Sequence, residues 1–118
     1  MGAKTSQMDV CKRVGAEYVP PLPGSKLGIS LNVQEGMFPI NGLRHPPGGD
    51  TNGWYIWDGE TMSKDPGFFK PLHVEHAAAW CADIVKYLAL PPGWRFLIGP
   101  GYEDVWFDAD ILEIPAGQ

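Results

Sequence analysis

Two histidines one helical turn apart are the first side chains in this sequence that could do chemistry. His73 and His76 can share a metal ion if a helix carries them, and His45 could add a third ligand from a loop. The helical pair typical of zinc hydrolases is spaced i, i+4 around a glutamate, and that pattern is absent. We therefore expect no metal, and expect both imidazoles to lie partly buried beside Trp80.

The acidic residues near the end of the chain are a second candidate. Glu103, Asp104 and Asp108 could include the general acid and base of a glycoside hydrolase. No nucleophile or convergent base accompanies them, and the signatures of serine hydrolases, phosphate loops, dinucleotide sites and catalytic Cys–His pairs are missing. The sequence therefore predicts a protein with no catalytic residue and no cofactor.

The net charge of −5 is concentrated at the same end of the sequence. Residues 1–102 contain nine acids and nine bases, and no Lys or Arg follows Arg95. Such an end repels nucleic acid and attracts basic partners, although a solvated terminus that only aids solubility is the alternative. The excess consists of Glu103, Asp104, Asp108, Asp110 and Glu113.

Aromatic residues are also concentrated, and a domain of this size cannot bury all of them. Exposed Trp and Tyr beside acids are typical of a protein-binding patch. The competing interpretation is a small-ligand cleft around Trp54 and Trp57. The rings in question are Trp54, Tyr55, Trp57, Trp94, Tyr102 and Trp106.

The elements that must position these side chains include at least three strands. Leu27–Val33 alternates apolar and small polar residues, as a half-buried strand does. Met37–Leu43 contains Pro39, which favours an edge or an irregular strand, and Asn41-Gly42 as a turn signal. Trp54–Asp58 is the next strand, after a loop.

A helix is predicted over about residues 72–89, ending before Pro91. Its apolar stripe at i, i+3, i+4 spacing would cover one face of the sheet. Between the stripe and the solvated side runs a strip that carries the histidines and Tyr87. The stripe consists of Val74, Ala77, Ala78, Cys81, Val85 and Leu88.

A hairpin closes the chain. We expect strands Trp94–Ile98 and Asp104–Asp108, joined by a five-residue connection that contains Gly99, Pro100 and Gly101. If Ile98 opposes Asp104, then Phe96 faces Trp106 and Trp94 faces Asp108. Both faces would be largely apolar, so the hairpin is predicted to be central and covered by the helix.

These elements indicate an α+β protein with a mostly antiparallel sheet and one main helix packed on one face. We expect residues 1–24 to be an N-terminal segment with a short helix near Ser6, and 25–114 to be a single domain. Met8, Cys11 and Val14 would share a face of that helix. No apolar run is long enough for a membrane span, and no secretory signal is present, so a cytoplasmic location is expected.

Several short motifs in the middle of the chain resemble those of a known family. Their order is similar to that of immunity-protein family thirty-three of the bacterial polymorphic toxins, and LPPGWRFLIGPGYEDVWFD looks like the close of a thirty-three-like branch. The resemblance covers roughly residues 27–112, most of the chain. In chain order the motifs are Arg44, a Gly/Asp loop, Gly53-Trp54, Gly59-Glu60 and Asp65-Pro66.

The sequence departs from the main family in having Asn52 where Ser is usual, and in its extended His45–Asn52 loop. The resemblance implies a non-catalytic α+β domain that binds a cognate toxin protein and blocks it. A small-ligand-binding domain of unknown metabolic role is the alternative. The partner-binding residues expected are Arg44, Trp54, Trp57, Glu60, Tyr102, Glu103, Asp104, Trp106 and Asp108.

Overall fold

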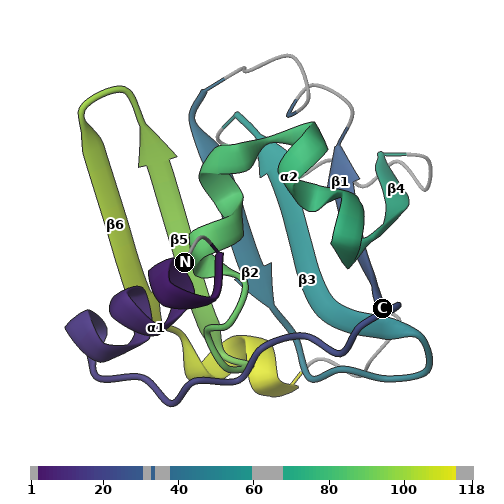
Figure 1. Cartoon of the computed structure of the whole chain (residues 1–118), viewed down its shortest axis with the longest axis horizontal. Coiled ribbons are helices and arrows are strands. Elements are labelled where there is room, and N and C mark those ends of the chain that lie inside the picture. Colours follow the sequence, from purple (N-terminus) through teal and green to yellow (C-terminus); the bar gives the residue numbers. More distant parts are fainter. Residues whose placement is uncertain (1–2, 31–32, 34–37, 60–67, 114–118) are drawn as a thin grey trace.

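A computed structural model of the chain describes residues 3–30, 33, 38–59 and 68–113. These residues form a six-stranded sheet in the order β4-β1-β3-β2-β5-β6 (Figure 1). Only β1 and β3 pair in parallel; the other neighbours are antiparallel. The predicted α+β class with a mostly antiparallel sheet is therefore confirmed. The strands are β1 (Lys26–Ser30), β2 (Ile40–Arg44), β3 (Thr51–Asp58), β4 (Phe69–His73), β5 (Trp94–Gly99) and β6 (Tyr102–Phe107).

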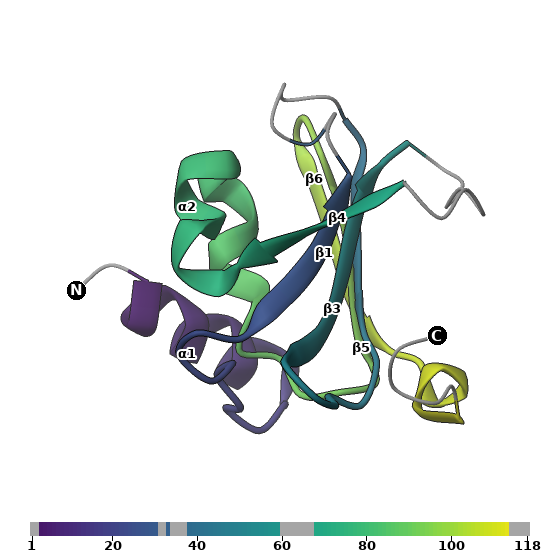
Figure 2. The same ribbon diagram turned by 90° about the vertical axis from the view of Figure 1, so that its right-hand side faces the viewer.

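Helical segments lie on both faces of this sheet, most of them on one (Figure 2). The N-terminal helix begins at Ala3, earlier than Ser6, and buries Val10 and Cys11 while Met8 remains exposed. None of the helices in the described parts of the chain is long and apolar enough to cross a bilayer. On one face are α1 (Ala3–Val14), η2 (Val74–His76), α2 (Ala77–Trp80) and η3 (Ala82–Tyr87), and on the other is η4 (Ala109–Glu113).

The prediction of one continuous helix over residues 72–89 is wrong. Leu72 pairs with Leu27 as part of β4, and the helical segment that follows breaks at Cys81, whose φ of −160° and ψ of 103° are extended. The break lets Ile84 and Tyr87 face the sheet, and both are fully buried. Burying two large side chains contributes about 1.5–3 kcal/mol each, which outweighs the helical hydrogen bonds lost at the break.

The hairpin register also differs from the prediction by one residue. Ile98 opposes Glu103 and Phe96 opposes Val105, so Trp106 lies on the other face from Phe96. The connection is a two-residue turn of Pro100 and Gly101, in which Gly101 has a φ of +80°. The hairpin is at the edge of the sheet, not at its centre, because β6 pairs with β5 alone among the strands of the described residues.

Strand β2 occupies the central position instead, between β3 and β5. It begins just after Pro39, because proline has no N–H for the ladder. The Asn41-Gly42 pair is not a turn but the middle of this strand. A Cβ on Gly42 would lie 2.2 Å from a ring carbon of Phe96, so glycine is required here for close packing.

The core between sheet and helices is aromatic at its centre. The ring of Tyr87 stacks on Phe96 with centroids 4.5 Å apart, and Phe96 packs against Trp54 at 5.7 Å. Val10 and Cys11 join the same cluster, so α1 shares the core of the sheet. A smaller cluster on the opposite face is formed by Leu43, Trp57 and Ile111.

Candidate functional site

The predicted site residues fall into an interior group and a surface group. Trp54 is 0% exposed, and its Nε1 donates to the Leu88 carbonyl at 2.9 Å. Trp57 is 3% exposed and meets Phe69 edge-on at 6.3 Å. Both rings therefore stabilise the sheet from within. Glu60 lies outside the described residues.

Arg44 joins three segments of the chain from its place at the end of β2. Its Nε donates to the Asn52 carbonyl at 2.9 Å, and its Nη1 donates to the carbonyls of Val19 at 2.7 Å and Leu90 at 2.8 Å. Its guanidinium also lies 5.9 Å from the centre of the Trp54 ring. Burial lowers the pKa of Arg44 to about 10, so the side chain is charged at neutral pH.

The Gly53-Trp54 motif has a simple packing reason. Gly53 has a φ of +92°, and a Cβ there would lie 1.9 Å from the carbonyl oxygen of His45. The two strands approach closely here, since the His45 N–H donates to the Gly53 carbonyl at 2.8 Å. The loop between them is shorter than expected because β3 already begins at Thr51. Glycine therefore allows the backbone contact that brings Trp54 into the core.

Glu103, in the surface group, is held by residues far away in sequence. Arg13 Nη1 lies 2.6 Å from Glu103 Oε1, Lys86 Nζ lies 3.8 Å from Oε2, and the Tyr87 hydroxyl donates to Oε2. The bond with Arg13 is the main reason that the pKa of Glu103 is below its usual value. Burial and the neighbouring carboxylate raise the pKa of Tyr87, which stays protonated. Glu103 thus joins α1, η3 and β6.

Asp108 is held in a similar way at the other end of β6. Its Oδ2 lies 3.0 Å from Arg95 Nη1, and its Oδ1 accepts the Asp110 backbone N–H at 3.1 Å. The Arg95 guanidinium lies 5.3 Å from the centre of the Trp106 ring. Two of the five C-terminal acids are therefore neutralised within the fold. The folded protein has fewer unpaired acids at this end than the sequence suggests.

The remaining residues of this end form an exposed edge, which we call the β6 surface, with Tyr102, Asp104 and Trp106 on one face of the strand and Phe107 on the other. Tyr102 is 49% exposed and Phe107 50%, while Trp106 is half-buried. Asp104 and Asp110 are exposed and make no ion pair with any residue that the structure describes. The β6 surface comprises Tyr102, Asp104, Trp106, Phe107 and Asp110.

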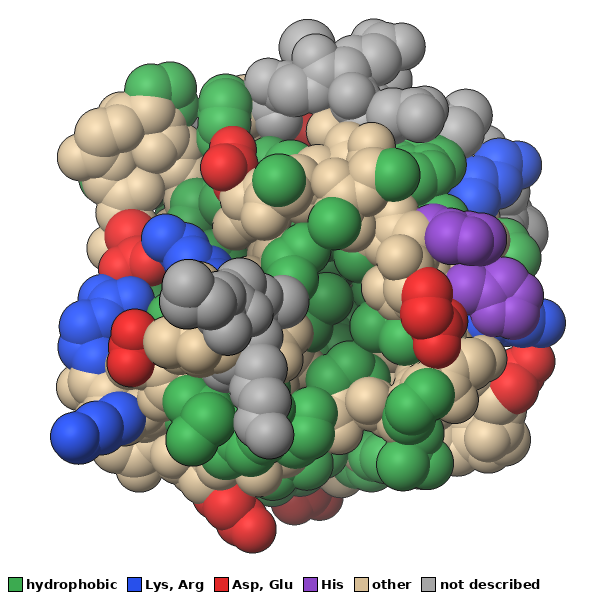
Figure 3. Space-filling view, viewed as in Figure 1, with side chains coloured by type: hydrophobic (Ala, Val, Ile, Leu, Met, Phe, Trp, Pro, Cys, Tyr) green, Lys and Arg blue, Asp and Glu red, His purple; other side chains and the backbone are tan. Residues whose placement is uncertain are grey.

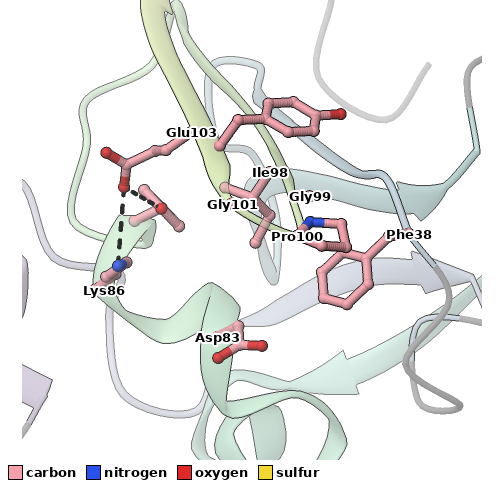
Figure 4. A pocket seen from close by; sticks show the side chains of 10 residues that line it. Phe38, Asp83, Lys86, Ile98, Gly99, Pro100, Gly101 and Glu103 are labelled. Atoms are coloured by element: carbon pink, nitrogen blue, oxygen red, sulfur yellow. Dashed lines mark hydrogen bonds and ion pairs between the residues drawn. The ribbon is translucent and has the colours of Figure 1, made fainter.

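An open groove of about 580 Å³ lies between η3 and the tip of the hairpin (Figure 4). Lys86 and Glu103 are on one side of it, whereas Phe38 and Pro100 are on the other. In the lining of this groove, the protonated hydroxyl of Tyr87 donates to the carboxylate of Glu103, which is also ion-paired. That pair suits a structural hydrogen bond better than an activated nucleophile.

The three histidines do not converge. His73 and His76 are exposed, with ring centroids 6.0 Å apart, so the expected partial burial is wrong; histidines are visible at the surface in Figure 3. Their exposure follows from β4 and η2, which replace the predicted helix here. His45 is buried, and its Nδ1 lies 3.0 Å from the Ile111 carbonyl. Among the residues whose placement is described, no three His, Cys, Asp or Glu could hold a metal ion.

The fold and this site define a small α+β domain with helices mainly on one face and an acidic, aromatic strand at one edge. The family model described as Imm33-like domain matches residues 6–108, so the chain belongs to that immunity-protein family. The match begins within α1 and so extends further toward the N-terminus than the resemblance recognised in the sequence. Neither the curated proteins nor the solved structures gave a match.

Sequence reasoning missed two parts of this site. The bridge from Glu103 to Arg13 joins residues 90 positions apart, and no local pattern predicts it. The exposure of Phe107 depends on the hairpin register and on the edge position of β6. A signal for the register was present, because Pro100-Gly101 is the pair preferred at the centre of a type II turn.

Proposed function

We propose that this protein is an immunity protein that binds a cognate bacterial toxin in the cytoplasm and blocks it by occupancy, without chemistry of its own. Membership of the Imm33-like family supports the class of function. The choice of site rests on the β6 surface, where exposed rings lie beside acids that make no ion pair with a described residue.

The charge of this surface favours a basic partner. Its two acids, Asp104 and Asp110, are exposed and make no ion pair among the described residues. Toxins that act on nucleic acid carry basic substrate sites, which acids of a bound inhibitor can occupy. Complementary charge raises the association rate and suppresses wrong partners.

The aromatic rings would supply the buried centre of such an interface. Tyr102 and Phe107 are half exposed, and each is positioned by a neighbour: Tyr102 covers Gly99, and Phe107 meets the Trp94 ring edge-on at 5.8 Å. Trp106 is oriented in advance by Arg95, which Asp108 holds in turn. A ring that is already ordered loses less conformational entropy on binding.

The other predicted site residues have a supporting role in this proposal. Arg44 and Trp54 fix β2 and β3 from within, while Glu103 fixes β6 against α1 and η3. Trp57 belongs to the cluster under η4. Because Trp54 and Trp57 are buried, they form no open cleft for the alternative small ligand.

The test is a protection assay in cells that express the toxin encoded beside this gene. Asp104→Lys reverses one charge of the β6 surface and should weaken toxin binding by at least about tenfold, with a matching loss of protection. Asp9→Lys on α1 makes the same charge change at an exposed position that does not belong to the β6 surface and should protect normally. Full protection by Asp104→Lys, with normal stability of both variants, would contradict the assigned site.

A further inference from the structure

A second cavity opens beside Arg44 and shares no residue with the β6 surface. Its volume is about 360 Å³, within the range of small-ligand sites. Apolar side chains line much of it, among them Val19, Leu22 and Pro47. Gly48 and Gly49, of the loop between β2 and β3, complete the rim, and Arg44 is its charged residue.

Arg44 has donors to spare at this cavity. A guanidinium carries five N–H groups, and Nε and Nη1 use three of them on the carbonyls of Asn52, Val19 and Leu90. The two N–H groups of Nη2 donate to no residue that the structure describes. Arg44 lines this cavity, and its Nη2 is not sealed from solvent, so these two N–H groups are available to a ligand there.

The charge of Arg44 is not balanced within the fold. The side chain is 3% exposed, and no carboxylate in the described part of the chain lies within ion-pair distance of it. Asp50 is near in sequence, but its carboxylate lies 3.1 Å from Lys26 Nζ. The three carbonyls that Arg44 bonds are neutral. A buried cation with free donors ordinarily has an anionic partner.

The geometry points to a binding site for a carboxylate on a short apolar chain. The carboxylate oxygens accept the two N–H groups of Arg44 Nη2, and the apolar chain packs against Val19, Leu22 and Pro47. The apolar lining reduces the contact of a bound carboxylate with water and so strengthens the charge-assisted bonds. A free organic acid and the C-terminal end of a partner polypeptide both present this chemistry.

Titration of the labelled full-length protein with butyrate, followed by amide NMR at constant ionic strength, tests the site. Butyrate should shift the Gly48 and Gly49 amides saturably, with a Kd on the order of millimolar as befits so small a ligand. Butyramide has the same shape without the charge and should bind at least about tenfold more weakly. No saturable shift, or equal shifts by both compounds, would overturn the proposal.

A matched pair of variants tests whether the amide shifts come from binding in the cavity. Neither variant removes Arg44, which holds three segments together. Leu22 is 76% exposed on the cavity wall, and Leu22→Glu adds a competing carboxylate there. This change should weaken butyrate binding at least about tenfold while the fold is retained. Leu112→Glu on η4 makes the same substitution outside the cavity lining and should bind butyrate normally. Equal affinities of the two variants would count against the site.

Two further ligands distinguish the sources of the carboxylate. Acetyl-Gly-Leu with a free C-terminus imitates the end of a partner chain, and its C-terminal amide is the control. Tighter binding of the peptide acid than of butyrate assigns the site to a polypeptide terminus. Equal or weaker binding of the peptide acid assigns it to a small organic acid. Binding of the peptide amide as tight as that of the acid would contradict carboxylate recognition.

Discussion

Strands β2 and β6 belong to one sheet, yet their burial is the reverse of what their compositions suggest. β2 is Ile-Asn-Gly-Leu-Arg, with two polar residues, and all five residues are buried. β6 is Tyr-Glu-Asp-Val-Trp-Phe, with three aromatic rings, and none of its residues is fully buried. Position in the sheet, more than side-chain polarity, therefore decides which strand belongs to the interior.

The central strand has partners for most of its polar groups. β3 and β5 pair with its two edges, and Asn41 Nδ2 donates to the Gly59 carbonyl. Arg44 donates to three further carbonyls. The outer strand instead leaves Tyr102 and Phe107 half exposed. The comparison teaches that β2 specifies the fold, whereas β6 is available for recognition.

The largest effect should come from crowding the centre. Gly42→Ala places a methyl group 2.2 Å from the Phe96 ring and should cost about 3 kcal/mol of unfolding free energy, measured by urea denaturation. Gly101→Ala, in the hairpin turn, meets no atom within 4 Å and should cost only about 1 kcal/mol, through its positive φ. Equal losses would show that the contact with Phe96 is not what makes the centre intolerant.

A medium effect is expected where β6 is tied to the helices. Glu103→Gln should cost about 1 kcal/mol at about pH 7, at the low end for a charge-assisted hydrogen bond because the site is partly in water. The folded pKa of Glu103 lies below the usual 4.5, so its stabilisation is present above about pH 4.5 and is lost as the pH falls through the folded pKa. The deficit of the Gln variant should therefore be smaller at an acidic pH, below about 4.5, than at about pH 7.

Urea denaturation of both proteins at the two pH values measures this difference. Glu17→Gln is the control, because Glu17 is exposed and makes no ion pair among the described residues. A deficit of the Glu103 variant that persists unchanged in acid would mean that packing, not the carboxylate charge, joins β6 to α1.

The smallest effect should come from the exposed edge itself. Tyr102 opposes Gly99, and its ring covers that glycine, but the side chain is half in solvent. Tyr102→Ser should therefore cost only about 0.5 kcal/mol, as typical cross-strand pairs do. Thermal or urea unfolding measures it, and a loss well above about 1 kcal/mol would show that β6 is held as firmly as the interior.

The features that sequence alone predicted correctly were those with a local signal. Alternation marked β1, the aromatic run of Trp54–Asp58 marked most of β3, and the Gly-Pro-Gly connection marked a hairpin. Hydrophobic periodicity and turn residues act over a few positions in sequence. They can therefore be recognised without knowing which distant segments pack against them. The α+β class followed from these elements.

What could not be predicted depends on contacts between distant parts of the chain. Asn41-Gly42 has the composition of a turn, and only the Phe96 ring against it explains why it lies within a strand. The acids near the end of the sequence form one charged block along the chain. In the fold, Arg13 neutralises Glu103 and Arg95 neutralises Asp108. Whether the remaining acids and rings meet a toxin stays a prediction for the protection assay.

The place of β1 in the sheet bears on how the chain is made. β1 lies between β3 and β4, and both of these strands are synthesised after it. The β2–β3 pair can form once Asp58 has left the ribosome and offers β1 its first partner, whereas the other edge of β1 stays open until His73 has followed. The nascent chain thus carries an apolar strand with an open edge for some time, and this interval is prone to aggregation.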